Sequence, residues 1–245
     1  MNNTFDLKRF KQVLSCDWRL YLHNFGITLL VWIGMPVMFW VTSLVFGYEI
    51  DTLSRLFFLL GIVAITVMSA PSRIYGKANL PRDGVRFAML PASALEKFVS
   101  MALYCSFLTP VLAFFGGWLI DSLMALLPFG GFIDFVSFRS PRMVSADYAL
   151  MAVAFISLVW TESAVFMFGN MFFWRRKAGK TFGWTLLVLF ALTLLLEFTD
   201  AWVVIDNFFA DLNDTQSLWI IIIVQWIIAA GFYFATYRKI KTQKY

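Results

Sequence analysis

The sequence predicts an all-α, polytopic membrane protein with six transmembrane helices, an N-terminal amphipathic interfacial helix and both termini in the cytoplasm. Three observations predict this fold class. Hydrophobic residues make up 60% of the 245, and the mean hydropathy is +0.75, whereas soluble domains are only about half apolar. The apolar residues gather into six stretches, each close to the roughly 20 residues with which a helix crosses a bilayer. The Lys and Arg content of the intervening segments alternates along the chain.

The expected spans cover about 26–47, 53–70, 98–120, 148–173, 182–198 and 217–237. The longest segments between them, 71–97 and 121–147, are too short for a folded soluble domain, which rarely has fewer than about 50 residues. We therefore expect residues 1–245 to form a single transmembrane domain. If the protein uses ATP, the ATPase must be on another chain.

The basic residues predict the orientation of the spans. All but three of the 20 Lys and Arg residues lie in the two terminal segments or in the loops 71–97 and 174–181. By the positive-inside rule these segments are cytoplasmic, and the loops 121–147 and 199–216 are outside. The exceptions are Arg55, Arg139 and Arg142. The net charge of +5 thus reflects topology and contact with the lipid bilayer, not with nucleic acid.

Residues 5–21 carry apolar side chains at helical spacing opposite a basic face. This pattern is typical of a helix lying in the membrane interface. A cytosolic helix packed on a partner is the alternative. The apolar positions are Leu7, Phe10, Val13, Leu14, Trp18 and Tyr21.

The second span is expected to end at Pro71, which opens the largest cytoplasmic loop, residues 71–97. Near the end of this loop, Ser93 and Glu96 have the spacing of a capping box, in which each side chain bonds the other residue's backbone N–H. The third helix is therefore expected to begin near Ala94.

The usual enzyme signatures are missing from the sequence. Gly179-Lys180-Thr181 resembles the end of a phosphate-binding loop, but Trp174 occupies the position of the required earlier glycine. His23 is the single histidine and has no cluster of Cys or carboxylates beside it, as a zinc site requires. We expect no catalytic, cofactor-binding or metal-binding residues on this chain.

Glu162 lies near the middle of the fourth expected span, where an ionised side chain costs about 3 kcal/mol. One interpretation places Glu162, together with Gln225, on a translocation path, where the carboxyl contacts substrate or titrates. The other is structural: the carboxyl is protonated, or it is hydrogen-bonded to Thr161, Ser163 or Gln225. The sequence leaves both open.

Three segments carry a resemblance to a known family. They are the amphipathic helix 5–21 leading into the first span, the segment 90–98 (LPASALEKF), and the segment 168–181 (FGNMFFWRRKAGKT). With six spans and both termini inside, the chain resembles the membrane subunit of an ABC-2 type transporter, especially the small separate-chain permeases common in Bacteroidetes. This resemblance implies a location in the bacterial inner membrane.

In that family the N-terminal helix is an elbow on the membrane, and the loop between the second and third spans carries a coupling helix that docks on the ATPase. The resemblance implies that coupling falls in about 75–89, with Arg82, Asp83, Arg86 and Phe87 as candidate residues. It also implies a second permease copy or a paralogue, and a cognate ATPase that binds ATP and Mg. A non-transport accessory or scaffold subunit of a membrane complex is the alternative function.

Overall fold

The computed structural model describes residues 5–47, 52–80, 84–126, 146–199, 203 and 213–242. Within these ranges the regular secondary structure is helical and no strand is present. Six helical segments are long and apolar enough to cross a membrane. The predicted multi-pass, all-helical membrane protein is thereby confirmed.

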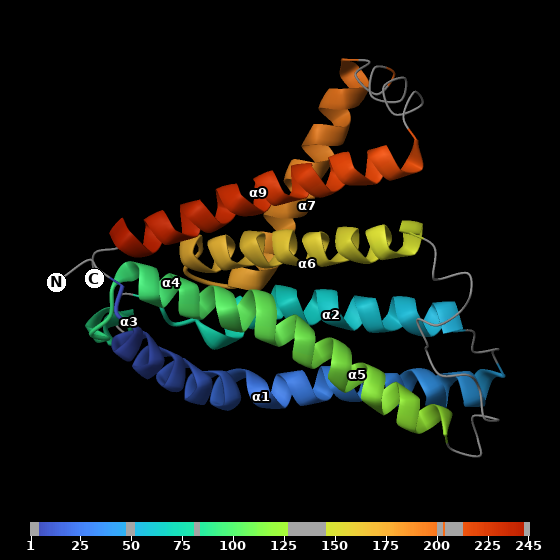
Figure 1. Ribbon diagram of the computed structural model, residues 1–245, viewed down its shortest axis with the longest axis horizontal. Coiled ribbons are helices and arrows are strands. Elements are labelled where there is room, and N and C mark those ends of the chain that lie inside the picture. Colours follow the sequence, from blue (N-terminus) through green and yellow to red (C-terminus); the bar gives the residue numbers. More distant parts are fainter. Residues whose placement is uncertain are drawn as a thin grey trace.

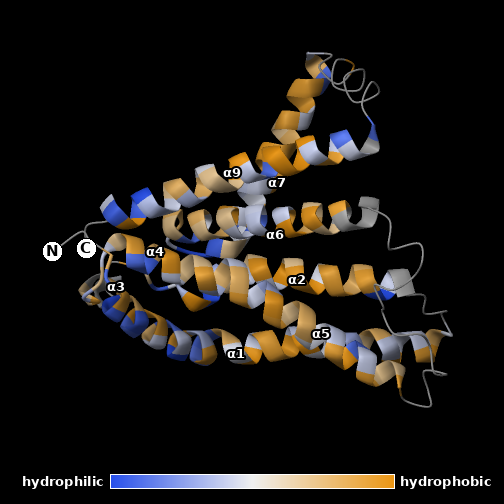
Figure 2. Cartoon of the chain, viewed as in Figure 1, coloured by the Kyte–Doolittle hydropathy of each residue, from blue (hydrophilic) through white to orange (hydrophobic). Residues whose placement is uncertain are grey.

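The helices follow one another as α1 (Leu7–Phe46), α2 (Thr52–Ile74), α3 (Gly84–Met89), α4 (Ala94–Ala102), the π-helical segment η1 (Leu103–Leu108), α5 (Thr109–Ala125), α6 (Ala146–Phe172), α7 (Lys177–Phe198) and α9 (Asp214–Thr242). The segments α4, η1 and α5 are continuous and form one span. The start of α1, the end of α9 and α3 lie at one end of the bundle (Figure 1), which we call the terminal end; the opposite end is the distal end. Hydrophilic residues are frequent at the terminal end, and hydrophobic residues dominate the length of the helices (Figure 2).

The N-terminal segment differs from the expected separate interfacial helix. Residues 5–21 and the first span are parts of one uninterrupted helix, α1, of 40 residues, which is about 60 Å long and twice the thickness of a bilayer core. Its first half buries every fourth side chain against the protein: Val13, Asp17, Tyr21, Phe25 and Leu29. Packing within this chain accounts for Val13 and Tyr21 of the amphipathic pattern, whereas Leu7 and Trp18 are 74% and 42% exposed, so the interfacial position of this segment stays a prediction.

Two expected span boundaries are displaced. Helix α2 does not end at Pro71 but continues to Ile74, and the Tyr75 N–H still bonds the Pro71 carbonyl. Asp121, expected to open an outer loop, lies inside α5, and Arg55, one of the three exceptions to the charge pattern, lies in the second turn of α2. The start of α4 at Ala94 agrees with the prediction.

Segment η1 widens the third span into a π-helix of six residues. Pro110 follows it directly, in the first turn of α5. A proline has no N–H to donate to the preceding turn, and this rearranges the helical hydrogen bonds around it. The wider turn brings Tyr104, Cys105 and Ser106 into the buried core.

The core is densest where α1, α2, η1 and α6 meet, with Phe25, Val67, Met101 and Met167 fully buried there. Helix α6 also packs along α9. Helix α7 behaves differently: it contacts α6 and α2 near its start and then leaves the bundle (Figure 1). Only 6% of its apolar window is buried, so this helix presents nearly all of its surface to lipid or to another chain.

Candidate functional site

A buried carboxylate lies at the junction of α1, α2 and α4. One oxygen of Asp17, Oδ2, accepts hydrogen bonds from the Tyr75 hydroxyl at 2.9 Å and from the Ser100 hydroxyl at 2.5 Å. Asp17 is 3% exposed, Tyr75 2% and Ser100 0%. Burial and the nearby Asp17 carboxylate raise the pKa of Tyr75 well above its usual value, so its hydroxyl keeps the proton that it donates.

A further set of hydrogen bonds involves η1. The Tyr104 hydroxyl donates to the Leu14 carbonyl of α1 at 2.8 Å, and the Thr109 hydroxyl donates to the Tyr104 carbonyl at 2.8 Å. The Tyr104 ring lies 5.7 Å from the ring of Tyr21, centroid to centroid. The first half of α1 is thus fastened to η1 by polar and aromatic contacts.

A second group of hydroxyls joins η1 to the other side of the bundle. Ser106 lies 2.7 Å from the Ser163 hydroxyl of α6, and the Tyr233 hydroxyl of α9 donates to Ser106 at 2.7 Å. Together the two groups link α1, α2, α4, η1, α6 and α9. We call them the polar core: Asp17, Tyr21, Tyr75, Ser100, Tyr104, Ser106, Thr109, Ser163 and Tyr233.

The polar core has the chemistry of a helix-positioning element. Its members are one carboxylate and hydroxyls, and a hydroxyl both donates and accepts and can rotate to a new partner. Among the described residues, no group of three or more His, Cys, Asp or Glu is placed to hold a metal ion. The arrangement suits interhelical hydrogen bonds that can be exchanged when helices move.

Glu162 and Gln225 do not meet across a hydrogen bond. Gln225 of α9 accepts from the Ser157 hydroxyl through its side chain, and from the Thr161 hydroxyl through its carbonyl at 3.0 Å. Ser163 pairs with Ser106. Within the described ranges the half-buried Glu162 carboxyl bonds none of Thr161, Ser163 and Gln225. The translocation path and the protonated structural carboxyl both stay predictions.

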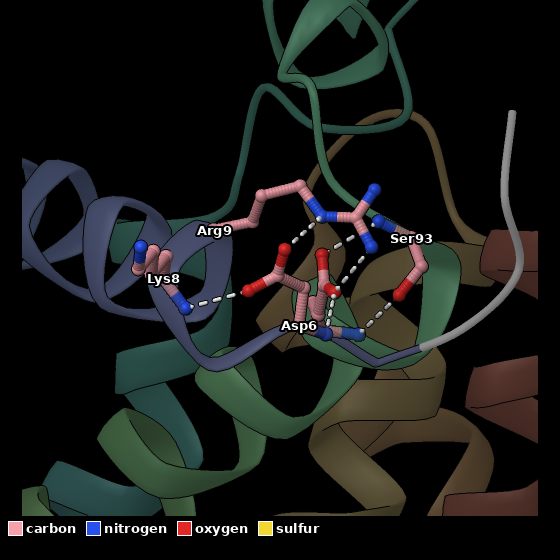
Figure 3. A network of polar contacts seen from close by, with 5 residues as sticks. Asp6, Lys8, Arg9 and Ser93 are labelled. Atoms are coloured by element: carbon pink, nitrogen blue, oxygen red, sulfur yellow. Dashed lines mark hydrogen bonds and ion pairs between the residues drawn. The ribbon is translucent and has the colours of Figure 1, made fainter.

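The expected capping box is present at the start of α4. The Ser93 hydroxyl accepts from the Glu96 N–H at 3.2 Å, and the Glu96 carboxylate accepts from the Ser93 N–H at 2.8 Å. Glu96 also accepts from the Asp6 N–H at 2.8 Å and pairs with the Arg9 guanidinium at 3.2 Å (Figure 3). The capping residue therefore fastens the beginning of α1 to the beginning of α4, a contact that the sequence did not predict.

Of the four candidate coupling residues, the structure describes the side chain of Phe87 alone. Arg82 and Asp83, like the side chain of Arg86, lie outside the described part of the chain. Phe87 in α3 faces inward: its ring lies 6.4 Å from the Tyr75 ring, and its carbonyl accepts from Lys97 Nζ at 2.7 Å. The half-buried Phe87 thus anchors α3, and its role in coupling stays a prediction.

The Gly179-Lys180-Thr181 segment forms part of the first turns of α7. The Thr181 hydroxyl donates to the Lys177 carbonyl at 2.8 Å, and the Thr181 side chain packs so tightly on Gly169 that a Cβ there would overlap it. The Thr181 hydroxyl is thus hydrogen-bonded within the helix.

Sequence reasoning missed Asp17, Arg55 and Asp121, all of which are at most 3% exposed. One signal was present for each of them. Asp17 continues the four-residue spacing of Val13 and Tyr21, and the other two lie within one or two turns of the ends of apolar stretches. A lone charge at such a position resembles the polar flank of a span. The fold alone shows that these three side chains have polar partners inside the helix bundle.

Comparison with protein-family models, with curated proteins and with solved structures finds no match to this chain.

Proposed function

We propose that this chain is the membrane-spanning permease subunit of an ATP-driven transporter of the ABC-2 type. It exports an amphipathic or lipid-like substrate by alternating access, as one of two permease copies or paralogues in the bacterial inner membrane. Both termini are cytoplasmic, and the first turns of α1 lie at the cytoplasmic interface. ATP hydrolysis, with ATP and Mg, takes place on a separate ATPase chain.

The observation that carries this proposal is the attachment of α3 to the helices that cross the membrane. Lys97 of α4 holds α3 through the Phe87 carbonyl at 2.7 Å, and its ammonium lies 5.3 Å from the Phe87 ring centre. Glu96, one residue earlier, holds the start of α1. A displacement of α3 is therefore transmitted to α4 and α1 together, as a rigid-body movement.

The polar core supports the same mechanism. It lies where α1 and α4 meet the rest of the bundle, and its hydroxyls can change partners at low cost. A rigid movement of α1 and α4 would exchange these bonds without leaving buried polar groups unpaired, which otherwise costs about 1–3 kcal/mol for each group.

Site-specific photo-crosslinking tests the proposed coupling surface. Met89 in α3 is 77% exposed, and Leu126 at the distal end is 53% exposed, so a photo-reactive amino acid fits at either position. We expect a crosslink to an ATPase chain from position 89 in native membranes and none from position 126. Equal labelling from both positions, or a crosslink from 89 to a membrane protein without an ATPase, would favour the accessory or scaffold subunit.

Substitution of Arg82 and Asp83 by Ala is a second test of the proposed coupling segment. The double variant is expected to keep its fold and to lose association with the ATPase or stimulation of its activity. Arg238 and Lys239 lie at the end of α9, and their double Ala variant is the control for a loss of surface charge elsewhere on the chain. Full ATPase association and activity in the Arg82 and Asp83 variant would refute the coupling assignment.

A further inference from the structure

A basic pocket opens at the terminal end, between the last turn of α2 and the first turn of α7. Its volume is about 350 Å³, at the lower end of the range for small-ligand sites. Arg73 comes from α2, and Arg176 and Lys177 come from the start of α7. Three cations from two helices thus converge on one concave surface.

Within the part of the chain that the structure describes, no acidic side chain neutralises any of these three cations. The three ion pairs found among the described residues involve Arg9 and Arg55 only. Lys177 is 8% exposed, and its ammonium donates to the Gly76 carbonyl at 2.5 Å and to the Asn79 side-chain oxygen. Both acceptors are neutral, so the positive charge at the pocket remains available to an anion.

The backbone of α7 adds donors to the same pocket. Arg176 provides no side-chain cap for α7, and its first turn contains no acidic residue. The first N–H groups of a helix lack partners within the helix, and the helix dipole makes that end positive. Ala178 and Gly179 of this turn line the pocket, and the space above Gly179 is open.

The surroundings indicate an anion attached to apolar chains. Trp174 lines the pocket and is 65% exposed, and Phe182 and Trp184 of α7 are 47% and 56% exposed. Exposed tryptophans are typical of the level of the lipid headgroups. The apolar surface of α7 begins about one turn beyond the pocket, so chains attached to a bound anion would meet that surface directly.

We propose that this pocket binds the phosphate headgroup of an anionic phospholipid whose acyl chains lie along α7. Basic pockets between transmembrane helices on the cytoplasmic side recognise such headgroups. This site is independent of any coupling to an ATPase, because it uses neither α3 nor the polar core. A zwitterionic choline lipid is disfavoured because its cationic group would meet the same three cations.

Native mass spectrometry of the purified full-length protein tests the proposal, with phosphatidylglycerol or phosphatidylcholine of identical acyl chains added in mild detergent. Wild type is expected to retain phosphatidylglycerol in preference to phosphatidylcholine. The Arg73→Gln and Arg176→Gln double variant is expected to lose about thirtyfold in phosphatidylglycerol affinity, since each basic residue near an anionic lipid contributes roughly a factor of five.

Gly179→Asp separates binding from folding. A carboxylate in the first turn of α7 stabilises the helix but repels a headgroup phosphate, so this variant is expected to lose the lipid and keep or raise its thermal stability. The control matched to the Arg73 and Arg176 double variant is Arg238→Gln with Lys239→Gln, which also removes two positive charges, at the end of α9. This control is expected to retain phosphatidylglycerol.

Three results would overturn the proposal. They are equal retention of the two lipids by wild type, equal loss of phosphatidylglycerol in the control and pocket variants, and unchanged retention in Gly179→Asp. Displacement of the lipid by millimolar inorganic phosphate would show that the pocket takes free phosphate instead of a lipid; we expect no displacement, because the acyl chains contribute to binding.

Discussion

Arg55 and Asp121 form a buried ion pair that joins the second turn of α2 to the last turns of α5. Arg55 Nη2 lies 2.5 Å from Asp121 Oδ2, and Arg55 Nε lies 3.1 Å from both carboxylate oxygens. The Trp40 indole of α1 donates to Asp121 at 2.9 Å. The Arg55 guanidinium lies 5.2 Å from the centre of the Trp40 ring. One charged pair and one indole thus hold three helices together at the distal end, opposite the polar core.

Replacement of Asp121 by Asn is expected to destabilise the protein by about 3–5 kcal/mol, because it removes the carboxylate that pairs with the buried Arg55 guanidinium. The double variant Arg55→Met with Asp121→Leu should recover most of this loss, since it removes both charges. Thermal unfolding in mild detergent measures the effect, with the exposed Glu197→Gln as the control. Equal stability of Asp121→Asn and wild type would mean that the pair does not hold the helices together.

Replacement of Tyr75 by Phe removes one of the two hydroxyl donors to Asp17 and leaves the ring in place. We expect a loss of about 1.5–3 kcal/mol, the range for a hydrogen bond to a charged group. Tyr237→Phe is the matched control, because no described residue hydrogen-bonds the Tyr237 hydroxyl while its ring still contacts Phe98. If the two variants unfold at the same temperature, the bond to Asp17 contributes nothing to stability.

The sequence predicted the helices well because hydrophobic burial and span length act locally along the chain. Ala94 was predicted to begin a helix from the Ser93 and Glu96 side chains alone, and the structure contains both bonds. Pro71 was misread as the end of a helix, since a proline in the final turns is tolerated where the helix is packed on both sides.

The buried polar partners could not be predicted, because each pair is far apart in the sequence. Asp17 meets Tyr75 and Ser100 only after α1, α2 and α4 have packed, and Ser106 meets Tyr233 across the bundle. The π-helix at η1 had one local signal, Pro110, but a proline in a transmembrane helix is accommodated in several ways. The tertiary contacts decide which one occurs.

Replacement of Gly169 by Ala is expected to push α7 away from α6, because a Cβ on Gly169 would overlap the Thr181 side chain. Overpacking of this kind costs about 1–3 kcal/mol. Gly231→Ala in α9 is the control, since a Cβ there meets no atom within 4 Å. Thermal unfolding of the two variants decides: a stable Gly169→Ala protein would show that α6 and α7 are not tightly packed at this point.

Replacement of Glu162 by Gln is expected to leave folding intact and to change transport-linked ATPase activity. The structural reason is that the Glu162 carboxyl is not engaged by Thr161, Ser163 or Gln225, whose bonds go elsewhere. Gln225→Leu, by contrast, breaks the bond to Ser157 and is expected to lower stability. Unchanged ATPase stimulation in Glu162→Gln would remove this residue from the proposed translocation path.

The central claim, that this chain works with an ATPase, is tested most directly by purifying the tagged protein from its native membrane in mild detergent and identifying what co-elutes. We predict a stoichiometric companion that contains a phosphate-binding loop, with ATPase activity in the complex. Recovery of a stable complex of other membrane proteins, with no ATPase chain and no ATP hydrolysis, would contradict the claim and favour the accessory-subunit alternative.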